Sequence, residues 1–316
     1  MKFKKILVYN IDKSKNLDPK SWKTIESFGN KMVFVPKDSP KLKQELADTD
    51  CVLVNFGTAV AKKEIVDAPQ LKYVGVMATA FGKIDTNYAK KKKVIVSNLK
   101  GYSTESVAEF IFAAILEQSR GLEEGKRRGR SGNYSEIGIS ANEIKNKIFG
   151  VIGLGTIGKR AAEIALGFGA KVKYWSRTRK KEYEKKGVKY EELDKLIREA
   201  DYMSINLAQA KKTEKIFDKN IFQKVKSGVV IINTAPMELV DIDALVQRLK
   251  KGDITFILDH SDEMSEKDLK ILSKYKNCII YPPIAYVSKE AAENKRRIFI
   301  ENIEGFLKGK PQNVVN

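Results

Sequence analysis

Histidine and cysteine are scarce in this sequence of 316 residues, which contains only His260, Cys51 and Cys278. A zinc site built from several histidine or cysteine ligands is excluded, because a closed tetrahedral site needs four ligands. We therefore expect no metal site. A reaction that requires an imidazole has only His260 to use.

Long apolar runs are also absent. No stretch approaches the ~18 apolar residues that cross a bilayer, and the first ten residues lack the apolar core and the small-residue cleavage site of a signal peptide. Since the two cysteines lie far apart in the sequence, a reducing compartment is the simplest environment. We expect a cytoplasmic protein with no membrane partner.

Acidic residues are outnumbered, with 40 Asp+Glu against 59 Lys+Arg and a net charge of +19. The densest basic run, at 126–130, could bind phosphate. The lysines are nevertheless spread along the chain and mostly alternate with glutamates, as at 180–195, which is typical of a solvated helix face. No motif that reads RNA or DNA accompanies the charge, so we do not expect a nucleic-acid partner.

The length suggests about two domains. Short β-branched runs alternate with amphipathic stretches in two series, which predicts an α/β fold with parallel sheets. The six strands of the second series match a doubly wound dinucleotide-binding (Rossmann) domain. Strands are predicted at 6–9, 32–35, 51–55, 73–77 and 94–97, then at 148–152, 172–175, 202–207, 229–232, 255–258 and 278–281. Helices are predicted at 105–120 and 288–307, and a loop or arm at 121–142.

A glycine-rich turn follows the strand at 148–152 and opens a helix. Its first glycine permits a tight turn, the second lets the backbone approach a pyrophosphate, and the third allows the helix to pack closely on the strand. The start of the helix offers free N–H donors to the phosphates. The predicted cofactor-binding turn is Gly153-Leu154-Gly155-Thr156-Ile157-Gly158.

The end of the next strand predicts which dinucleotide binds. An acidic residue about 20 positions after the turn would hold the 2′-hydroxyl of NAD, but here the strand ends in Ser176, Arg177 and Thr178, followed by Arg179 and Lys180. Hydroxyl and guanidinium groups bind a 2′-phosphate, and no carboxylate repels one. We predict NADP, with NAD as the second choice, and Ser176, Arg177 and Thr178 as contacts.

With these residues in place, the sequence resembles the D-isomer-specific 2-hydroxyacid dehydrogenases over nearly its full length, and 174–180 is most similar to the glyoxylate and hydroxypyruvate reductases. Further matching segments are 68–73, 84–85, 101–109 and 231–235. The resemblance implies a smaller, flavodoxin-like substrate-binding domain made of residues 1–99 and 288–316, and a dinucleotide-binding domain at 100–287. It also implies a cleft between the two domains and a homodimer formed largely through the cofactor domains.

The resemblance also implies a catalytic set from which this chain departs. In the family a histidine protonates the carbonyl oxygen as hydride arrives, a glutamate pairs with that histidine, and an arginine holds the substrate. Hydride addition builds negative charge on oxygen, which must be protonated or stabilised. Pro236 stands where the arginine follows Asn-Thr-Ala, and Pro283 stands where the histidine follows a proline. Proline can do neither task.

The remaining site residues come from the same resemblance. Asp259 is expected near the nicotinamide carboxamide, and the glutamate's counterpart is Glu263 or Asp262. His260, next to Asp259, or Tyr286, just beyond the missing histidine, could supply the proton from a new position, although His260 could equally be satisfied by packing or solvent. Further cofactor contacts are implied at Asn206, Leu207, Thr234 and Ala235.

The resemblance also implies that backbone amides of a Gly-rich turn bind the substrate. At that place this chain has Ala78 and Thr79 after the strand at 73–77, and Asn55 at the end of the strand at 51–55. Main-chain amides there could bind an anion whatever the side chains are. We expect a small-molecule substrate, of which a 2-oxoacid is one possibility. Two functions remain open. The chain is either an NADP(H)-binding oxidoreductase acting on a CH–OH or C=O group with an atypical or impaired centre, or a redox-silent dinucleotide-binding sensor or scaffold.

Overall fold

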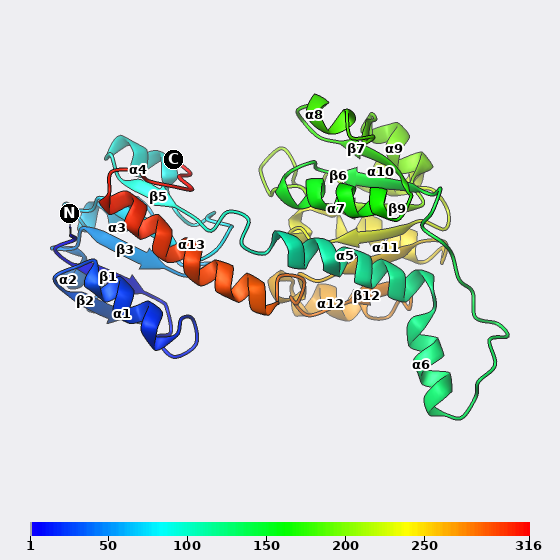
Figure 1. The fold of residues 1–316 in the computed structure, drawn as a ribbon, viewed down its shortest axis with the longest axis horizontal. Coiled ribbons are helices and arrows are strands. Elements are labelled where there is room, and N and C mark those ends of the chain that lie inside the picture. The colour runs from blue at the N-terminus through cyan, green and yellow to red at the C-terminus, as the bar shows by residue number, and fades with distance from the viewer. Residues whose placement is uncertain (1) are drawn as a thin grey trace. The chain divides into compact units, whose positions relative to one another are not determined.

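The computed structural model describes residues 2–316 and divides them into two compact units. The terminal unit runs to Ser103 and resumes from Ser288 to Asn316, and the central unit spans Thr104–Val287 (Figure 1). The expected boundary followed residue 99, whereas the division in the structure coincides with the start of the long helix α5 at Thr104.

The terminal unit contains a five-stranded parallel sheet in the order β2-β1-β3-β4-β5, which is the flavodoxin-like order. Its strands are β1 (Ile6–Tyr9), β2 (Met32–Val35), β3 (Cys51–Val54), β4 (Tyr73–Val76) and β5 (Ile95–Ser97). Its helices are α1 (Pro19–Ser27), α2 (Leu42–Leu46), α3 (Lys62–Asp67), α4 (Thr86–Lys91) and α13 (Lys289–Leu307).

Helices cover both faces of this sheet, because the strands are apolar on both sides, as is usual for buried parallel strands. Leu7, Val52 and Val74 lie in a core with residues of α2, α3 and α4. Cys51 and Tyr73 lie in a second core with residues of α1 and α13. The two ends of the chain therefore contribute to one domain.

The central unit contains a seven-stranded parallel sheet in the order β12-β11-β10-β9-β6-β7-β8. Its strands are β6 (Ile148–Ile152), β7 (Lys171–Trp175), β8 (Lys189–Tyr190), β9 (Tyr202–Ile205), β10 (Val230–Asn233), β11 (Thr255–Leu258) and β12 (Cys278–Ile280). The prediction of six strands was wrong by one. The missed strand, β8, has two residues at the sheet edge and carries no apolar run that the sequence could show.

Two groups of helices cover the faces of the central sheet. On one face lie α5 (Thr104–Ser119) and α7 (Thr156–Gly167), and on the other lie α9 (Leu193–Glu199), α10 (Lys219–Lys224), α11 (Ile242–Leu249) and α12 (Glu266–Leu272). The short α8 (Lys181–Glu184) precedes β8, and two 3₁₀ turns, η1 (Met237–Leu239) and η2 (Ser261–Glu263), follow β10 and β11.

The segment predicted as a loop or arm contains a helix, α6 (Leu122–Arg130), that buries none of its residues. Figure 1 shows α6 and the irregular chain after it projecting from the rest of the central unit. Arg128 holds the two together, since its guanidinium binds Glu124 and donates to the carbonyl oxygens of Ser135 and Ile137. Part of the basic run at 126–130 is therefore used within the arm itself.

Among residues 2–316, none of the helices is both long and apolar enough to span a bilayer. The same residues contain no group of three or more His, Cys, Asp or Glu side chains placed to hold a metal ion.

Candidate functional site

The predicted cofactor residues of the central unit lie at one edge of its sheet. Because all seven strands are parallel, their carboxyl ends share that edge. The order of the strands reverses at β6, which has β9 on one side and β7 on the other, and this topological switch point is where doubly wound sheets bind ligands. The residues that directly follow β6, β7, β9, β10 and β11 are Gly153, Ser176, Asn206, Thr234 and Asp259.

The three glycines of the turn after β6 differ in the geometry that surrounds each of them. Gly153 has φ +98°, and a Cβ there would lie 2.8 Å from the carbonyl oxygen of Asn206. At Gly158 a Cβ would lie 2.0 Å from the carbonyl oxygen of Gly153, so only glycine lets α7 begin this close to the turn. Around Gly155 a Cβ would meet no atom within 4 Å. The second glycine is therefore not required by packing, and the space beside it is open to a ligand.

The start of α7 faces the same open space. Gly155 is its N-cap and provides no side-chain cap, which leaves the first N–H groups of the helix without that kind of acceptor. An anion at this position would receive those donors and the positive end of the helix dipole. The turn therefore has the geometry that a pyrophosphate requires.

The loop after β7 carries the residues predicted to select NADP. Among residues 2–316, Arg177 has no carboxylate within ion-pair distance, and its side chain is exposed. Arg179 is engaged instead, because its Nε and Nη2 donate to the two carboxylate oxygens of Glu184 at 2.7 and 2.6 Å. The Ser176 hydroxyl donates to the carbonyl oxygen of Thr178 at 2.7 Å, which closes the loop. Arg177 is thus the guanidinium that is free to bind a phosphate.

Two buried oxygens at this edge lack a hydrogen-bond partner within the described chain. The Asn206 side chain donates to the hydroxyl and the carbonyl oxygen of Ser204, while its own Oδ1 accepts nothing. Asp259, only 2% exposed, accepts the backbone N–H of Ala285 through Oδ2, and its Oδ1 is unpartnered. Buried oxygens without partners are costly, so donors from a bound ligand would stabilise both. Burial raises the pKa of Asp259, although nearby His260 opposes this shift.

His260 lies beside Asp259 and contacts the loop after β10. Its Nε2 is 3.2 Å from the carbonyl oxygen of Thr234, and its Nδ1 is 3.6 Å from a carboxylate oxygen of Glu263. Burial alone would lower the pKa of His260, but Glu263, Asp259 and Asp262 outweigh burial and raise it. The structure therefore brings His260 and Glu263 together as a pair, one turn apart on the loop after β11.

The two prolines lie in the loops that follow β10 and β12. Pro236 precedes η1 after β10 and adopts φ −53°. Pro283 follows β12 in a segment that is held to Asp259 through the N–H of Ala285. Tyr286 comes three residues later, and its side chain is 43% exposed. Neither proline offers a proton or a charge, whereas the imidazole of His260 and the phenol of Tyr286 each carry a proton that can be transferred.

The predicted substrate residues belong to the terminal unit, after β3 and β4. The Thr79 hydroxyl donates to the carbonyl oxygen of Leu99, and Asn98 donates to the carbonyl oxygen of Thr79, so this loop is held from two sides. Ala78 accepts the N–H of Leu99. The Asn55 side chain accepts the N–H of Phe56. No motif of the sequence singled out Lys295, which lies in α13 of the same unit.

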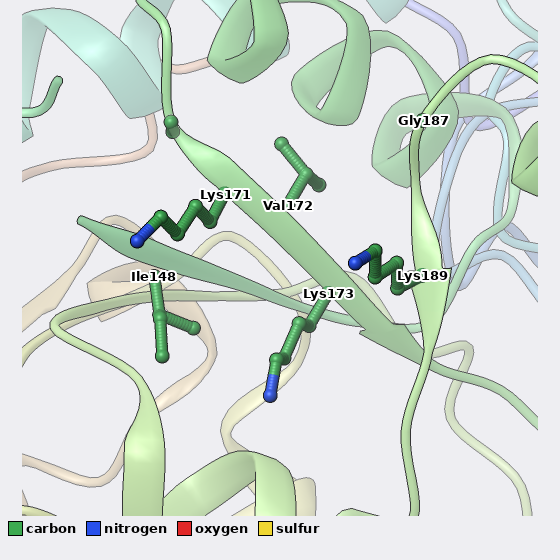
Figure 2. Close-up of a pocket in the computed structure, with 7 residues that line it drawn as sticks. Ile148, Lys171, Val172, Lys173, Gly187 and Lys189 are labelled. Carbon is green, nitrogen blue, oxygen red and sulfur yellow. The ribbon is translucent and has the colours of Figure 1, made fainter. Parts of the chain in front are cut away.

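A hollow of about 440 Å³ on the central unit lies away from this edge. Ile148 and Lys171 begin β6 and β7, and Lys189 begins β8, so the hollow lies at the amino ends of these strands. Figure 2 shows the lysines around it. Lys173 is bound there by Glu191 and Glu199. The hollow therefore does not belong to the predicted dinucleotide site.

A doubly wound sheet with a glycine turn at its switch point and unpartnered oxygens at the same edge defines a dinucleotide-binding α/β protein. The NAD-binding domain of the D-isomer-specific 2-hydroxyacid dehydrogenases matches residues 112–285. The chain is 32% identical over 307 residues to a hydroxypyruvate reductase from Blautia hydrogenotrophica, covering 93% of this chain and 94% of the relative. The chain therefore belongs to the D-isomer-specific 2-hydroxyacid dehydrogenase family and is an NAD(P)-dependent oxidoreductase.

Other relatives agree with this assignment. A glyoxylate reductase from Thermococcus litoralis is 31% identical over 293 residues, covering 89% of this chain and 88% of the relative. An acyclic imino acid reductase in complex with NADPH and D-Arg superposes with a TM-score of 0.86 at 30% identity, covering 98% of this chain and all of that one. A D-lactate dehydrogenase from Aquifex aeolicus, complexed with NAD and lactic acid, gives a TM-score of 0.84 at 29% identity, with 96% of each chain covered.

Proposed function

We propose that this protein is an NADP(H)-dependent reductase with an atypical catalytic centre, in which His260 takes the proton-donating task of the missing histidine. The observation that carries the proposal is the pairing of His260 with Glu263 beside Asp259, at the edge where the glycine turn lies. A histidine–carboxylate pair is the arrangement that a general acid needs, and here it arises from a different strand end.

The cofactor part of the proposal rests on the geometry of the central unit. Gly153, Gly155 and Gly158 would hold the pyrophosphate, Arg177 and Ser176 the 2′-phosphate, and Asn206 and Asp259 would accept donors through their unpartnered oxygens. When bound, the dinucleotide supplies a hydride to an unsaturated carbon of the substrate. The exposed, unpaired Arg177 favours NADP over NAD.

His260 has a defined place for its proton. With Nε2 against a carbonyl oxygen, the ring carries hydrogen on Nε2, and the raised pKa favours a second proton on Nδ1, facing Glu263. To protonate a substrate the ring must release the carbonyl oxygen of Thr234. Glu263 then keeps the imidazole oriented and stabilises its charged form. Tyr286 is the second candidate for the acid, because it is exposed and follows Pro283 closely.

The prolines also favour a second substrate class. A carbonyl needs a proton as its oxygen becomes negative, but a protonated imine already carries that proton on nitrogen. Hydride addition to the iminium carbon gives a neutral amine directly, and the C=N π electrons become the nitrogen lone pair. The similar acyclic imino acid reductase supports testing this class. A 2-oxoacid and the imine that it forms with an amine are therefore the two substrates to compare.

The same two prolines favour the redox-silent alternative, in which the dinucleotide is bound without being consumed. A transfer experiment separates the functions. NADPH carrying deuterium at C4 is incubated with glyoxylate, pyruvate and hydroxypyruvate, each with and without ammonia or a primary amine. Deuterium in a hydroxyacid or an amino acid product supports the reductase. Tight NADPH binding with no transfer to any acceptor would contradict it and support a sensor.

The proposal includes a homodimer formed through the central unit. None of the residues of α6, the helix that begins the arm, is buried. Beyond this helix, Tyr134 and Ile137 are 88% and 80% exposed. Large apolar side chains presented on an arm are typical of a surface that another chain covers. Light scattering should give twice the mass of the chain, and Tyr134→Ser with Ile137→Ser should shift it toward the monomer. A wild-type mass equal to one chain would contradict this part.

A further inference from the structure

We propose that Lys295 of α13 binds the anionic group of the substrate, beside the loop of the terminal unit that begins at Ala78. This inference rests on the proposed reductase function and names the residue that recognises its substrate. It follows from where α13 lies on β4, from the face of the helix that carries Lys295 and from the lack of an acidic partner.

Helix α13 runs antiparallel to β4 across the sheet of the terminal unit. Near the end of the helix, the ring of Phe306 lies 4.9 Å from that of Tyr73, which begins β4. Two turns earlier, Phe299 lies over Gly75, where a Cβ would be 3.4 Å from its ring. Moving back along the helix thus means moving forward along the strand. Figure 1 shows α13 crossing this sheet.

This register places Lys295 at the carboxyl end of β4. One helical turn from Phe299 to Lys295 spans about 6 Å, and two strand residues from Gly75 to Met77 span about 6.6 Å. Position 77 faces the same side of the sheet as position 75, and Met77 is buried in the core that contains Phe299. The next residues are Ala78 and Thr79, the predicted substrate loop.

Lys295 occupies the buried face of α13. Ala291, Phe299 and Ile303 are 2%, 1% and 0% exposed and are separated by eight and four residues, and Lys295 fills the missing position of this four-residue series. An apolar residue would be expected there. The position instead has a lysine of intermediate exposure whose alkyl chain can cover the core while the ammonium reaches the loop.

The Lys295 ammonium has no acidic partner among the residues that the structure describes, in contrast to buried Lys5 of the same unit, which binds Glu45 at 2.7 Å. Burial lowers the pKa of Lys295, and no carboxylate opposes the shift. A partly desolvated cation without a counter-ion is costly, and a bound carboxylate would remove that cost. Both a 2-oxoacid and its imine carry such a carboxylate.

The test uses oxamate, an unreactive analogue of a 2-oxoacid, titrated calorimetrically into the full protein with and without saturating NADPH. Lys295→Met should weaken oxamate binding about 10- to 100-fold, the loss expected for a hydrogen bond to a charged group. Lys295→Arg should restore most of the affinity. Lys289→Met is the matched control, since Lys289 is an exposed lysine of the same helix and should have no effect. NADPH affinity should stay constant in all variants.

A kinetic comparison separates carboxylate recognition from a general defect. In Lys295→Met, KM should rise for glyoxylate but not for glycolaldehyde, an uncharged aldehyde. The inference is overturned if Lys295→Met binds oxamate as tightly as the wild type, or if the wild type binds no oxamate with or without NADPH. Loss of oxamate binding in Lys295→Met, together with no hydride transfer by the wild type, would support Lys295 as an anion site and overturn the reductase function alone.

Discussion

Replacing Arg177 by alanine should change the cofactor preference of this protein without changing its stability. Arg177 follows the strand end that carries Ser176, is exposed, and has no ion-pair partner among residues 2–316. Its side chain is exposed, so we expect its removal to leave the folded protein undisturbed. The loss should therefore affect only a ligand that carries a phosphate at this point.

The magnitude follows from the exposure of the group. A hydrogen bond to a charged group contributes about 1.5–3 kcal/mol, or ~10- to 150-fold in Kd. Because Arg177 is open to solvent and salt, we expect the lower end, about tenfold, for NADPH. NADH lacks the 2′-phosphate, so its Kd should not change. The ratio of the two dissociation constants should fall by the same factor of about ten.

The assay can use an intrinsic probe. Trp175 is the last residue of β7 and directly precedes the loop, and the sequence contains only two tryptophans. Quenching of its fluorescence by NADPH or NADH gives both dissociation constants. Arg179→Ala is the matched control, because that guanidinium is already bound by Glu184 and should contribute little to the phosphate. Equal weakening of NADPH and NADH by Arg177→Ala, or tighter binding of NADH by the wild type, would contradict a contact between Arg177 and the 2′-phosphate.

Three further predictions concern the turn, the acid and the terminal core. Gly158→Ala should lower Tm and abolish NADPH binding, because its Cβ would lie 2.0 Å from a carbonyl oxygen, whereas Gly155→Ala should weaken NADPH binding at unchanged Tm; a normal Tm for Gly158→Ala would be inconsistent with the turn described. His260→Gln should lower turnover about 10²- to 10⁴-fold. In the wild type kcat/KM should fall as pH rises through the His260 pKa, which lies above 6.5, and unchanged kinetics in the variant would exclude this acid. Lys5 is 4% exposed, and its carboxylate partners outweigh burial and raise its pKa. The stability from this ion pair is therefore full below pH ~10.5 and lost above it, so Lys5→Met should unfold at lower urea at pH 7 and show less stability loss at high pH.

Most of the fold could be predicted because short runs of neighbouring residues mark its strands. Short runs rich in apolar residues marked eleven of the twelve strands of residues 2–316 within one or two residues, since buried parallel strands are apolar on both faces. Strand β8 escaped because Lys189 and Tyr190 pair only at the edge, where no apolar residue is needed. Helix α6 was not predicted because none of its residues is buried, so its sequence has no apolar periodicity.

Five of the predicted cofactor residues could be placed from the sequence, because each directly follows a strand: Gly153, Ser176, Asn206, Thr234 and Asp259. That they bind the cofactor stays a prediction. Backbone geometry fixes Gly153 and Gly158, and only glycine satisfies it. Whether a guanidinium is free could not be predicted, since Arg177 and Arg179 are alike in sequence and only the position of Glu184 distinguishes them. The pairing of His260 with Glu263 depends on the 3₁₀ turn η2, and its three polar residues give no sequence pattern from which that turn could be predicted.

The sequence pattern alone did not identify Lys295 as a candidate binding residue. A helix pattern is normally used to identify apolar positions, and a lysine at 295 reads as one more of the many lysines in the chain. The informative observation is that this lysine interrupts a series of buried residues spaced by four, at Ala291, Phe299 and Ile303. A charge on the core face of a helix is retained against a desolvation cost, which implies a partner. Since the described chain supplies none, we expect the partner to be an anionic ligand, whichever acid protonates the substrate.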